Sequence, residues 1–184
     1  MENEVLLQVK GLSFTYGEEP VLKDVNLIIR RGERIAVMGS NGAGKSTFFL
    51  NLNGVLRPDS GEILLCGSKI GKKELNLLRK KVGFVFQDAE SQIIAANVWA
   101  EISFGPMNLG LERREVIRRV DAAVSYLGLE ELQQRAPHYL SGGEKKQVSI
   151  ADILAMEPEL LIFDEPMAAL DPMNAQRVED ILGK

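Results

Sequence analysis

The feature that most constrains how this chain folds is the stretch "GSNGAGKST", residues 39–47, which directly follows the apolar run "RIAVM". It fits the pattern GxxxxGK[ST] between a predicted strand and a predicted helix, the context that gives this pattern its meaning. Glycines let the backbone wrap closely around a phosphate chain and aim successive N–H groups at it, with a helix N-terminus behind them. We therefore predict a phosphate-binding loop, the alternative being an ordinary glycine turn.

Each residue of this loop is a candidate contact to a nucleotide. Lys45 is predicted to reach the β- and γ-phosphates, and the Ser46 hydroxyl is predicted to ligate Mg²⁺. The complete predicted nucleotide-binding set in this loop is Gly39, Ser40, Asn41, Gly42, Ala43, Gly44, Lys45, Ser46 and Thr47.

A second motif lies near the end of the sequence, where the apolar run "LLIF" is followed by Asp164 and Glu165. At the end of a strand beside a phosphate loop, Asp164 is predicted to reach Mg²⁺, directly or through water. Glu165 is predicted to polarise a water for attack on the γ-phosphate. Without the phosphate loop, two surface acids at a strand-to-turn junction would be the simpler interpretation.

The third motif is "LSGGEKK", residues 140–146. Ser141 and Glu144 have the spacing of a capping box at the start of a helix. A cap does not require Gly142 and Gly143, whereas two bare backbone N–H groups at a positive helix end can form a second phosphate cradle. Because the chain has one phosphate loop, we predict that this cradle serves a nucleotide held by another chain.

Alternating strand and helix patterns predict an α/β fold with a largely parallel sheet. From about residue 90 to residue 158 the pattern is helical, and we expect a helical subdomain inserted in a single domain that spans 1–184. The predicted strands are "LLQVKGLSFTYG", "VNLIIRRGE", "RIAVMG", "EILLCG", "VGFVFQ" and "ELLIFDE". The predicted helices are "KSTFFLNLNG", "KKELNLLRKK", "ERREVIRRVDAAVSYLGL", "KKQVSIADILAME" and "DPMNAQRVEDILGK".

Composition narrows the class of protein. The 184 residues are 45% hydrophobic and 26% charged, which suits one globular domain rather than a solenoid or a disordered tail. A net charge of −4 argues against a dedicated nucleic-acid binder. No apolar run approaches the length of a membrane span, so we expect a cytoplasmic protein that docks on a membrane protein. The single cysteine, Cys66, is predicted to be a small core residue.

These motifs, in this order, resemble those of the ATP-binding subunits of ABC transporters. The resemblance identifies residues 39–47 as the Walker A loop, "LSGGE" as the signature and "LLIFDE" as Walker B. It implies that Tyr16 stacks on adenine, that Gln87 in "VGFVFQD" senses Mg²⁺ and the membrane subunit, and that Asp171 in "ALD" is the D-loop residue. The implied fold is a P-loop NTPase with a RecA-like core, an N-terminal antiparallel β subdomain and an inserted helical subdomain.

The stretch "DAESQIIAANVWAEISFGPMNLGL" resembles the cobalt and energy-coupling-factor group of importers. That resemblance implies an ATPase that uses ATP and Mg²⁺ and pairs with an identical or paralogous ATPase subunit. It also implies docking, at the cytoplasmic face of the membrane, on a transmembrane coupling subunit and a substrate-binding membrane component. The implied substrates are cobalt, another transition-metal ion or a vitamin, and no nucleic acid. Without the resemblance, "IIAANVWAEISF" is equally well explained as core.

Two other classes remain open. A soluble ABC ATPase of nucleic-acid or translation type is one, although the short segment between Gln87 and Ser141 has no room for the coiled coils of repair proteins. A truncated nucleotide-binding fragment with little hydrolysis is the other. The family has a switch histidine after the next strand, whereas the only histidine here, His138, precedes the signature. We therefore expect the domain to be incomplete at its C-terminus, and its turnover of ATP to be slow.

Overall fold

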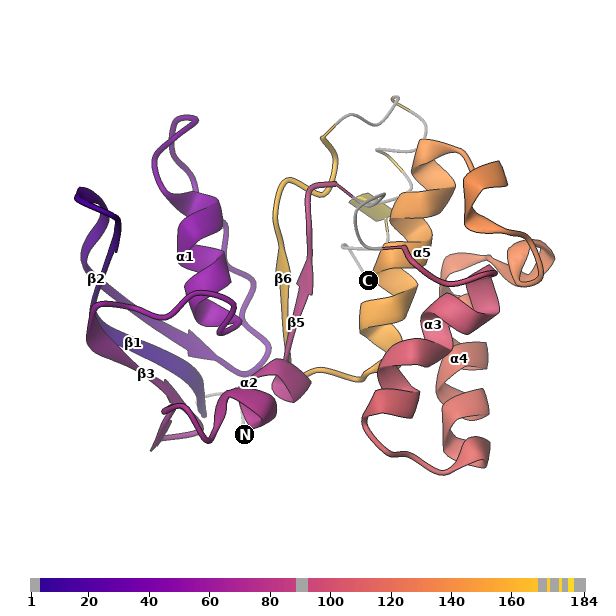
Figure 1. Cartoon of the computed structure of the whole chain (residues 1–184), viewed down its shortest axis with the longest axis horizontal. Coiled ribbons are helices and arrows are strands. Elements are labelled where there is room, and N and C mark those ends of the chain that lie inside the picture. The colour runs from indigo at the N-terminus through magenta and orange to yellow at the C-terminus, as the bar shows by residue number, and fades with distance from the viewer. Residues whose placement is uncertain (1–3, 89–92, 169–171, 173–175, 177–178, 181–184) are drawn as a thin grey trace. The chain divides into compact units, whose positions relative to one another are not determined.

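The computed structural model describes residues 4–88, 93–168, 172, 176, 179 and 180. The chain divides into two compact units, Met1–Val82 and Gly83–Lys184, which are described separately below (Figure 1). The phosphate-loop sequence lies in the first unit, and the other motifs except Tyr16 lie in the second.

The first unit contains an antiparallel sheet in the order β2-β1-β3-β4. Its strands are β1 (Val5–Tyr16), β2 (Glu19–Arg30), β3 (Ser60–Leu65) and β4 (Ser68–Lys69). Central β1 pairs on both sides, with Val9 opposite Leu27 of β2 and Ile63 of β3. The predicted strands "LLQVKGLSFTYG" and "VNLIIRRGE" are therefore both present, and they pair as a hairpin. Alternate residues of β1 are largely buried, as a half-exposed strand requires.

β1 and β3 approach each other most closely at two glycines. Gly11 and Gly61 both have positive φ, and a Cβ added to Gly61 would lie 2.4 Å from the Gly11 carbonyl oxygen. The register between the two strands is irregular between Lys10 and Ser13. Only glycine at 61 allows this backbone contact, because any side chain there would force the strands apart.

Two helices follow the predicted patterns in the first unit: α1 (Lys45–Leu52) and α2 (Leu75–Lys81). Gly54, just beyond α1, has a φ of 74° and would place an added Cβ 2.9 Å from the Leu75 side chain. Two side chains join the helices to neighbouring backbone: Asn53 Nδ2 donates to the Val82 carbonyl at 2.6 Å, and Arg79 donates to the Gly54 carbonyl at 2.8 Å. Gly54 thus ends α1 as predicted and admits α2 beside it.

The second unit contains two strands and three α-helices. The strands β5 (Val82–Val85), which begins one residue before the unit boundary, and β6 (Leu160–Phe163) form a two-stranded sheet. Between them lie α3 (Val98–Asn108), α4 (Arg113–Leu127), the 3-10 helices η1 (Glu130–Leu132) and η2 (Pro137–Tyr139), and α5 (Gly142–Ala155). The described residues from 93 to 158 are helical or irregular and contain no strand, in agreement with the pattern of that segment.

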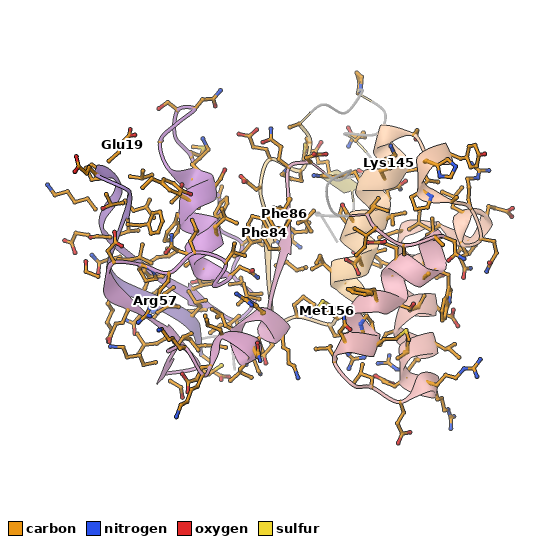
Figure 2. All side chains as sticks on the ribbon, in the orientation of Figure 1. Glu19, Arg57, Phe84, Phe86, Lys145 and Met156 are labelled. Carbon is orange, nitrogen blue, oxygen red and sulfur yellow. The ribbon has the colours of Figure 1, made fainter. Side chains whose placement is uncertain are left out.

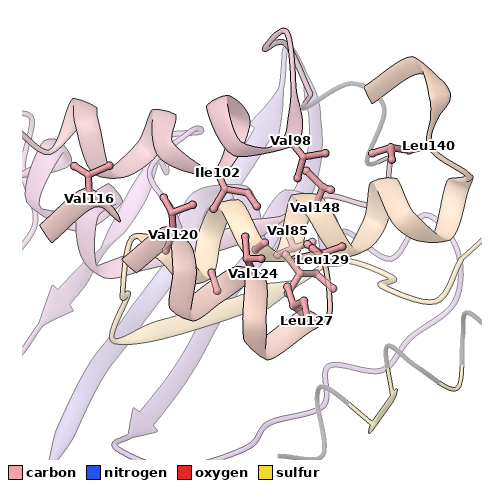
Figure 3. Packing of buried hydrophobic residues seen from close by; sticks show 14 residues of the cluster. Val85, Val98, Ile102, Val116, Val120, Val124, Leu127, Leu129, Leu140 and Val148 are labelled. Atoms are coloured by element: carbon pink, nitrogen blue, oxygen red, sulfur yellow. The ribbon is translucent and has the colours of Figure 1, made fainter. Parts of the chain in front are cut away.

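The core of the second unit lies between these helices and the end of β5 (Figure 3). The apolar face predicted for α4 is buried as expected, and Ile102 of α3, Val148 of α5 and Val85 of β5 join it. The buried residues of α4 are Val116, Val120, Ala123, Val124 and Leu127. Burial of this stripe, rather than helix propensity, accounts for the stability of α4.

A cluster of charges links α4 to Glu157, two residues beyond the end of α5. Glu115 accepts from Arg118 and Arg119, and both arginines also reach Glu157. Hydrogen bonds from Arg118 and then Arg119 lower the pKa of Glu115 to about 2. Since Glu115 and Glu157 are exposed to solvent, we expect this cluster to fix geometry more than to add stability.

Two predictions about the first unit are wrong. The run "RIAVMG" was predicted to be a buried strand, but residues 34–40 form no strand, and Ile35, Val37 and Met38 are 44%, 37% and 88% exposed. The apolar residues of this run indicate a segment that could bury its side chains. A strand also needs a neighbouring strand that pairs with its backbone N–H and C=O groups, and the apolar pattern gives no information about that neighbour. In the described sheet of this unit, residues 34–40 pair with none of the four strands.

Cys66 is exposed rather than buried. Cys66 and Gly67 are the two central residues of the hairpin between β3 and β4, with Leu65 paired to Ser68, and both have positive φ. This matches a type I′ turn, which the sequence shows only as "CG" after an apolar run.

The predicted largely parallel sheet is also not what the first unit shows, since each pairing with a described register there is antiparallel. The predicted helix "DPMNAQRVEDILGK" falls mostly outside the described residues, and Pro172, Gln176, Glu179 and Asp180, which are described, are helical. Among the described residues, no helix combines the length and the apolar character that crossing a membrane requires.

Candidate nucleotide site

The phosphate loop has the backbone that its glycines predict. Gly42 and Gly44 have φ values of 81° and 85°, in the left-handed region, and Gly44 is the N-cap of α1. An added Cβ at Gly44 would lie 3.0 Å from the Val21 side chain and 3.2 Å from the Val21 carbonyl oxygen, whereas the space beside Gly42 is open. Gly44 is thus required both by its φ and by the close approach of β2.

The Lys45 side chain lies back across this loop. Its Nζ donates to the Gly39 carbonyl at 2.9 Å and to the Ser40 carbonyl at 3.0 Å. The Ala43 N–H closes the loop on the Ser40 carbonyl at 3.2 Å. The ammonium therefore stands at the loop that is predicted to receive phosphates, and Asn41 and Ser46 beside it are exposed to solvent, while Thr47 is buried.

Tyr16 lies at the end of β1 with its side chain 49% exposed. Its ring meets Phe14 edge to face, with centroids 4.9 Å apart and planes at 85°. Packing into the core, the alternative explanation for an aromatic residue in a strand, is therefore wrong for Tyr16. The exposed ring face suits stacking on a planar base.

In the second unit, α5 begins with the predicted capping box. The Ser141 hydroxyl accepts from the Glu144 N–H at 3.3 Å, and the Glu144 carboxylate accepts from the Ser141 N–H at 2.7 Å. A Cβ added to Gly142 would meet no atom within 4 Å, so packing within this chain does not require glycine there. An open glycine at a capped helix start leaves its N–H accessible to an external acceptor.

The two acids after β6 differ in their surroundings. Asp164 is buried, 7% exposed, and its N–H donates to the Val85 carbonyl of β5 at 3.1 Å. Glu165 is exposed, has a φ of 45°, and accepts from the Gln87 side-chain amide at 3.0 Å. The structure thus brings Gln87 and Glu165, both predicted site residues, together.

Lys146 completes this group, although none of the sequence motifs points to it. Its side chain on α5 is only 2% exposed, and its Nζ donates to the Phe86 carbonyl at 2.7 Å and to the Gln87 carbonyl at 3.0 Å. Burial lowers the pKa of Lys146, and the carboxylates of Asp164 and Asp88 oppose that shift. The available signal was a lysine on the buried face of a helix, where charged residues are rarely found unless paired.

Two further acids lie on these helices: Glu101 of α3 is buried and Asp152 of α5 is partly buried. Glu101, 4% exposed, accepts from the Ile94 and Ala95 N–H groups at 3.0 and 2.7 Å, which ties the segment before α3 to that helix. Burial, with a smaller contribution from Glu101, raises the pKa of Asp152 to about 7. α5 therefore carries a cation and an acid that are both shifted by burial.

The predicted magnesium ligands are divided between the units: Ser46 belongs to the first, and Gln87 and Asp164 belong to the second. Within each unit the donors suit the ion, since hydroxyl, amide and carboxylate oxygens are the ligands that Mg²⁺ prefers. The loop glycines and Lys45 likewise suit a phosphate chain. Asp171, the predicted D-loop residue, lies outside the described residues.

Comparison with known proteins agrees with this assignment. The profile of the ABC transporter family matches residues 22–168. A putative ABC transporter ATP-binding protein of Methanosarcina acetivorans is 49% identical over 181 residues, which cover 97% of this chain and 56% of that protein. An energy-coupling factor transporter ATP-binding protein, EcfA, of Methanothermobacter thermautotrophicus is 47% identical over 180 residues, covering 96% of this chain and 58% of that protein.

Solved structures show the same fold. CbiO1 of Clostridium perfringens, part of the ABC transporter complex cbiONQ, superposes with a TM-score of 0.88 at 43% identity, covering 98% of this chain and 73% of that one. A dimeric ATP-binding cassette in a post-hydrolysis state, bound to ADP and Pi, gives a TM-score of 0.83 at 30% identity, covering 96% of this chain and 81% of that one.

The fold and motifs therefore define a nucleotide-binding protein of the P-loop class. The chain belongs to the ABC transporter family, and the predicted α/β fold class is confirmed. It spans little more than half the length of the first curated relatives that it matches.

Proposed function

We propose that the chain is the ATP-binding and ATP-hydrolysing subunit of an importer of the energy-coupling-factor group. The observation that carries the proposal is Lys45 held at 2.9 and 3.0 Å from the carbonyls of the glycine loop at the start of α1. A phosphate chain that enters this loop would replace the two carbonyl contacts with stronger charge-assisted ones. Similarity to energy-coupling factor ATP-binding proteins of several archaea supports the assignment.

In this proposal the two units supply different parts of the site. The first unit holds the base with Tyr16 and the phosphates with residues 39–47. The proposed ligands of Mg²⁺ are Ser46 in the first unit and Gln87 and Asp164 in the second, and Glu165 is proposed to orient the attacking water. Ser141, Gly142, Gly143 and Glu144 at the start of α5 contact a nucleotide held by a second ATPase subunit, and Asp171 contributes to that interface.

The proposed membrane partner is a transmembrane coupling subunit at the cytoplasmic face, acting with a substrate-binding component. The surface before and along α3 suits this role, because Ile94, Phe104 and Met107 are 73%, 51% and 60% exposed while Trp99 is half-buried. Exposed apolar groups so close together mark an interaction surface. We propose cobalt, another transition-metal ion or a vitamin as the transported substrate.

Docking is tested by replacing Phe104 with aspartate and purifying the chain from detergent extracts. A membrane component is expected to accompany the unaltered chain and to be lost with the variant. Recovery of tRNA, ribosomes or DNA with the unaltered chain would instead favour a soluble ABC ATPase.

Nucleotide binding is tested by calorimetry of Mg-ATP with Lys45→Ala. Loss of a charge-assisted contact of roughly 1.5–3 kcal/mol should raise the Kd about tenfold or more. Lys23→Ala, at an exposed position of β2, is the matched control and should bind ATP as the unaltered chain does. Equal affinity of the Lys45 variant and the unaltered chain would remove the phosphate-loop assignment.

A further inference from the structure

Among the described residues, Lys146 has the largest of the fully buried side chains, with an exposed fraction of 2%. The other large side chains buried to this degree are apolar. Its ammonium group meets two backbone carbonyls, those of Phe86 and Gln87, at 2.7 and 3.0 Å. A lysine is seldom buried so completely, because removing the charge from water is costly unless the group finds partners. The contact must therefore contribute enough to offset that cost.

The two carbonyls stand where β5 ends. β5 stops at Val85, so Phe86 and Gln87 have passed beyond the end of the strand. Phe86 is fixed on its side-chain side by an edge-to-face contact with Phe84, with centroids 4.4 Å apart (Figure 2). The Lys146 ammonium fixes the same residue on its backbone side and thereby sets the direction in which the Gln87 side chain leaves the chain.

The Gln87 side chain continues the connection. Its Nε2 donates to the Glu165 carboxylate at 3.0 Å, which leaves the Gln87 amide oxygen as an acceptor or ligand. One continuous set of contacts thus runs from α5 through Lys146 and Gln87 to Glu165. The same helix, α5, begins with the capped Ser141–Glu144 turn and carries Lys146. The proposed contact to a second nucleotide and the Gln87–Glu165 pair are therefore both connected to α5.

We infer that Lys146 is a positioning residue: its ammonium holds the Gln87 backbone so that the Gln87 amide orients Glu165, and it links this orientation to the N-terminus of α5. The catalytic consequence rests on the proposed function, whereas the positioning itself is a property of the unliganded chain. Lys146 touches neither substrate nor reacting atoms in this role. In this role Lys146 acts as a hydrogen-bond donor to the Phe86 and Gln87 carbonyls. The role does not depend on a charge on another side chain.

The positioning is tested by NMR of the side-chain amide of Gln87 in the unliganded full chain, with Gln87→Ala to identify its signal. Lys146→Met keeps the length and burial of the side chain but removes its donors, and it should shift the Gln87 amide signal to the position of a free glutamine side chain. The amides of Gln133 and Gln147, which bond to carbonyls elsewhere in the unit, should stay unchanged. Lys80→Met, at an exposed position of α2, controls for the substitution itself.

Lys146→Gln provides the second variant, because its amide retains N–H donors without the charge. It should keep the Gln87 signal near its original position, and it decides the question where the Met variant fails to fold. A folded Met variant with an unaltered Gln87 signal overturns the inference, and so does a folded Gln variant that loses the signal. Movement of the Gln133 and Gln147 signals together with that of Gln87 would show a general structural role and overturn it equally.

Phosphate release separates this inference from the proposed function. The Met variant should lower kcat roughly 10- to 100-fold, as expected for a misplaced catalytic group, with KM for ATP nearly unchanged. An unaltered kcat in the Met variant, with normal hydrolysis by the original chain, overturns the catalytic consequence alone. A chain that neither binds nor hydrolyses ATP before substitution overturns the proposed function, while the NMR result still decides the positioning.

Discussion

The phosphate loop of the first unit and the Gln87–Glu165 group of the second are assembled in opposite ways. The loop uses residues 39–47 and satisfies the Lys45 ammonium with carbonyls five and six positions away. The second group joins Lys146 to residues 59 and 60 positions away, and joins Gln87 to a residue 78 positions away. The first therefore depends on local backbone conformation, and the second depends on the packing of the whole unit.

This difference predicts how each site fails. In the loop, a substitution acts through the left-handed backbone and the close approach of β2, so its effects should stay near the site. In the second group, substitution of one residue should change the position of other residues far along the chain. The reason is that Lys146, Gln87 and Glu165 are joined by successive hydrogen bonds. Three sets of substitutions test that contrast.

The largest effect is expected from Glu165→Gln. Loss of the group that polarises water should lower the rate of phosphate release about 100-fold or more, as for other general bases. ATP affinity should remain, because the phosphate contacts belong to the first unit and the new side chain can still accept from Gln87. The measurements are phosphate release at saturating Mg-ATP and the ATP dissociation constant, and we expect the variant to favour an ATP-held dimer.

Glu130→Gln, an exposed acid of η1 in the same unit, is the matched control and should leave both quantities unchanged. If Glu165→Gln hydrolyses ATP at the original rate, the assignment of Glu165 is wrong. If it instead loses ATP binding, the separation of binding and catalysis between the two units is wrong.

The same contrast explains what could be predicted from the sequence. The left-handed backbone of the loop at Gly42 and Gly44 agrees with what its glycines predict. The helix α4 was predicted because its buried stripe follows the helical period. The run "RIAVMG" was mispredicted because apolar character does not reveal whether a strand has a neighbour. Cys66 was mispredicted because a short hairpin turn follows directly on a buried strand.

Lys146 shows the limit more sharply. In the sequence it is one of two adjacent lysines after the signature, and lysines are ordinarily exposed. Only the fold shows that helical phase places Lys146 inside, against carbonyls at the end of a strand 60 positions earlier. Gln87 was selected through family resemblance, and Glu165 was selected because it follows an apolar strand. Their hydrogen bond could not be derived from spacing, because it depends on how β5 and β6 pair.

A smaller effect is expected from a pair of substitutions in the loop, Gly44→Ala and Gly42→Ala. Both residues have φ near 80°, so each alanine should cost about 1–2 kcal/mol of stability for its left-handed backbone. At Gly44 the added Cβ also meets Val21 at 3.0–3.2 Å, including its carbonyl oxygen, and overpacking should add roughly 1 kcal/mol or more.

Denaturant unfolding of the two variants measures this difference directly, each serving as the other's control. A larger loss for Gly44→Ala would show that β2 supports the loop. Equal losses would mean that the loop is fixed by its own backbone alone, which would sharpen the contrast between the two sites.

The smallest effect is expected from Ser141→Ala at the start of α5. The hydroxyl accepts from the Glu144 N–H, and loss of such a cap typically costs about 1 kcal/mol of stability. Because Lys146 lies in the next turn and is held by its own contacts, the Gln87–Glu165 hydrogen bond should survive this substitution.

Ser125→Ala, at an exposed position of α4, is the control and should change stability by less than about 0.5 kcal/mol. Urea unfolding gives both values, and the Gln87 side-chain amide signal reports on the hydrogen bond. A shift of that signal in the Ser141 variant would show that the cap and the catalytic pair form one unit, so that the second site is even less local than Lys146 alone makes it.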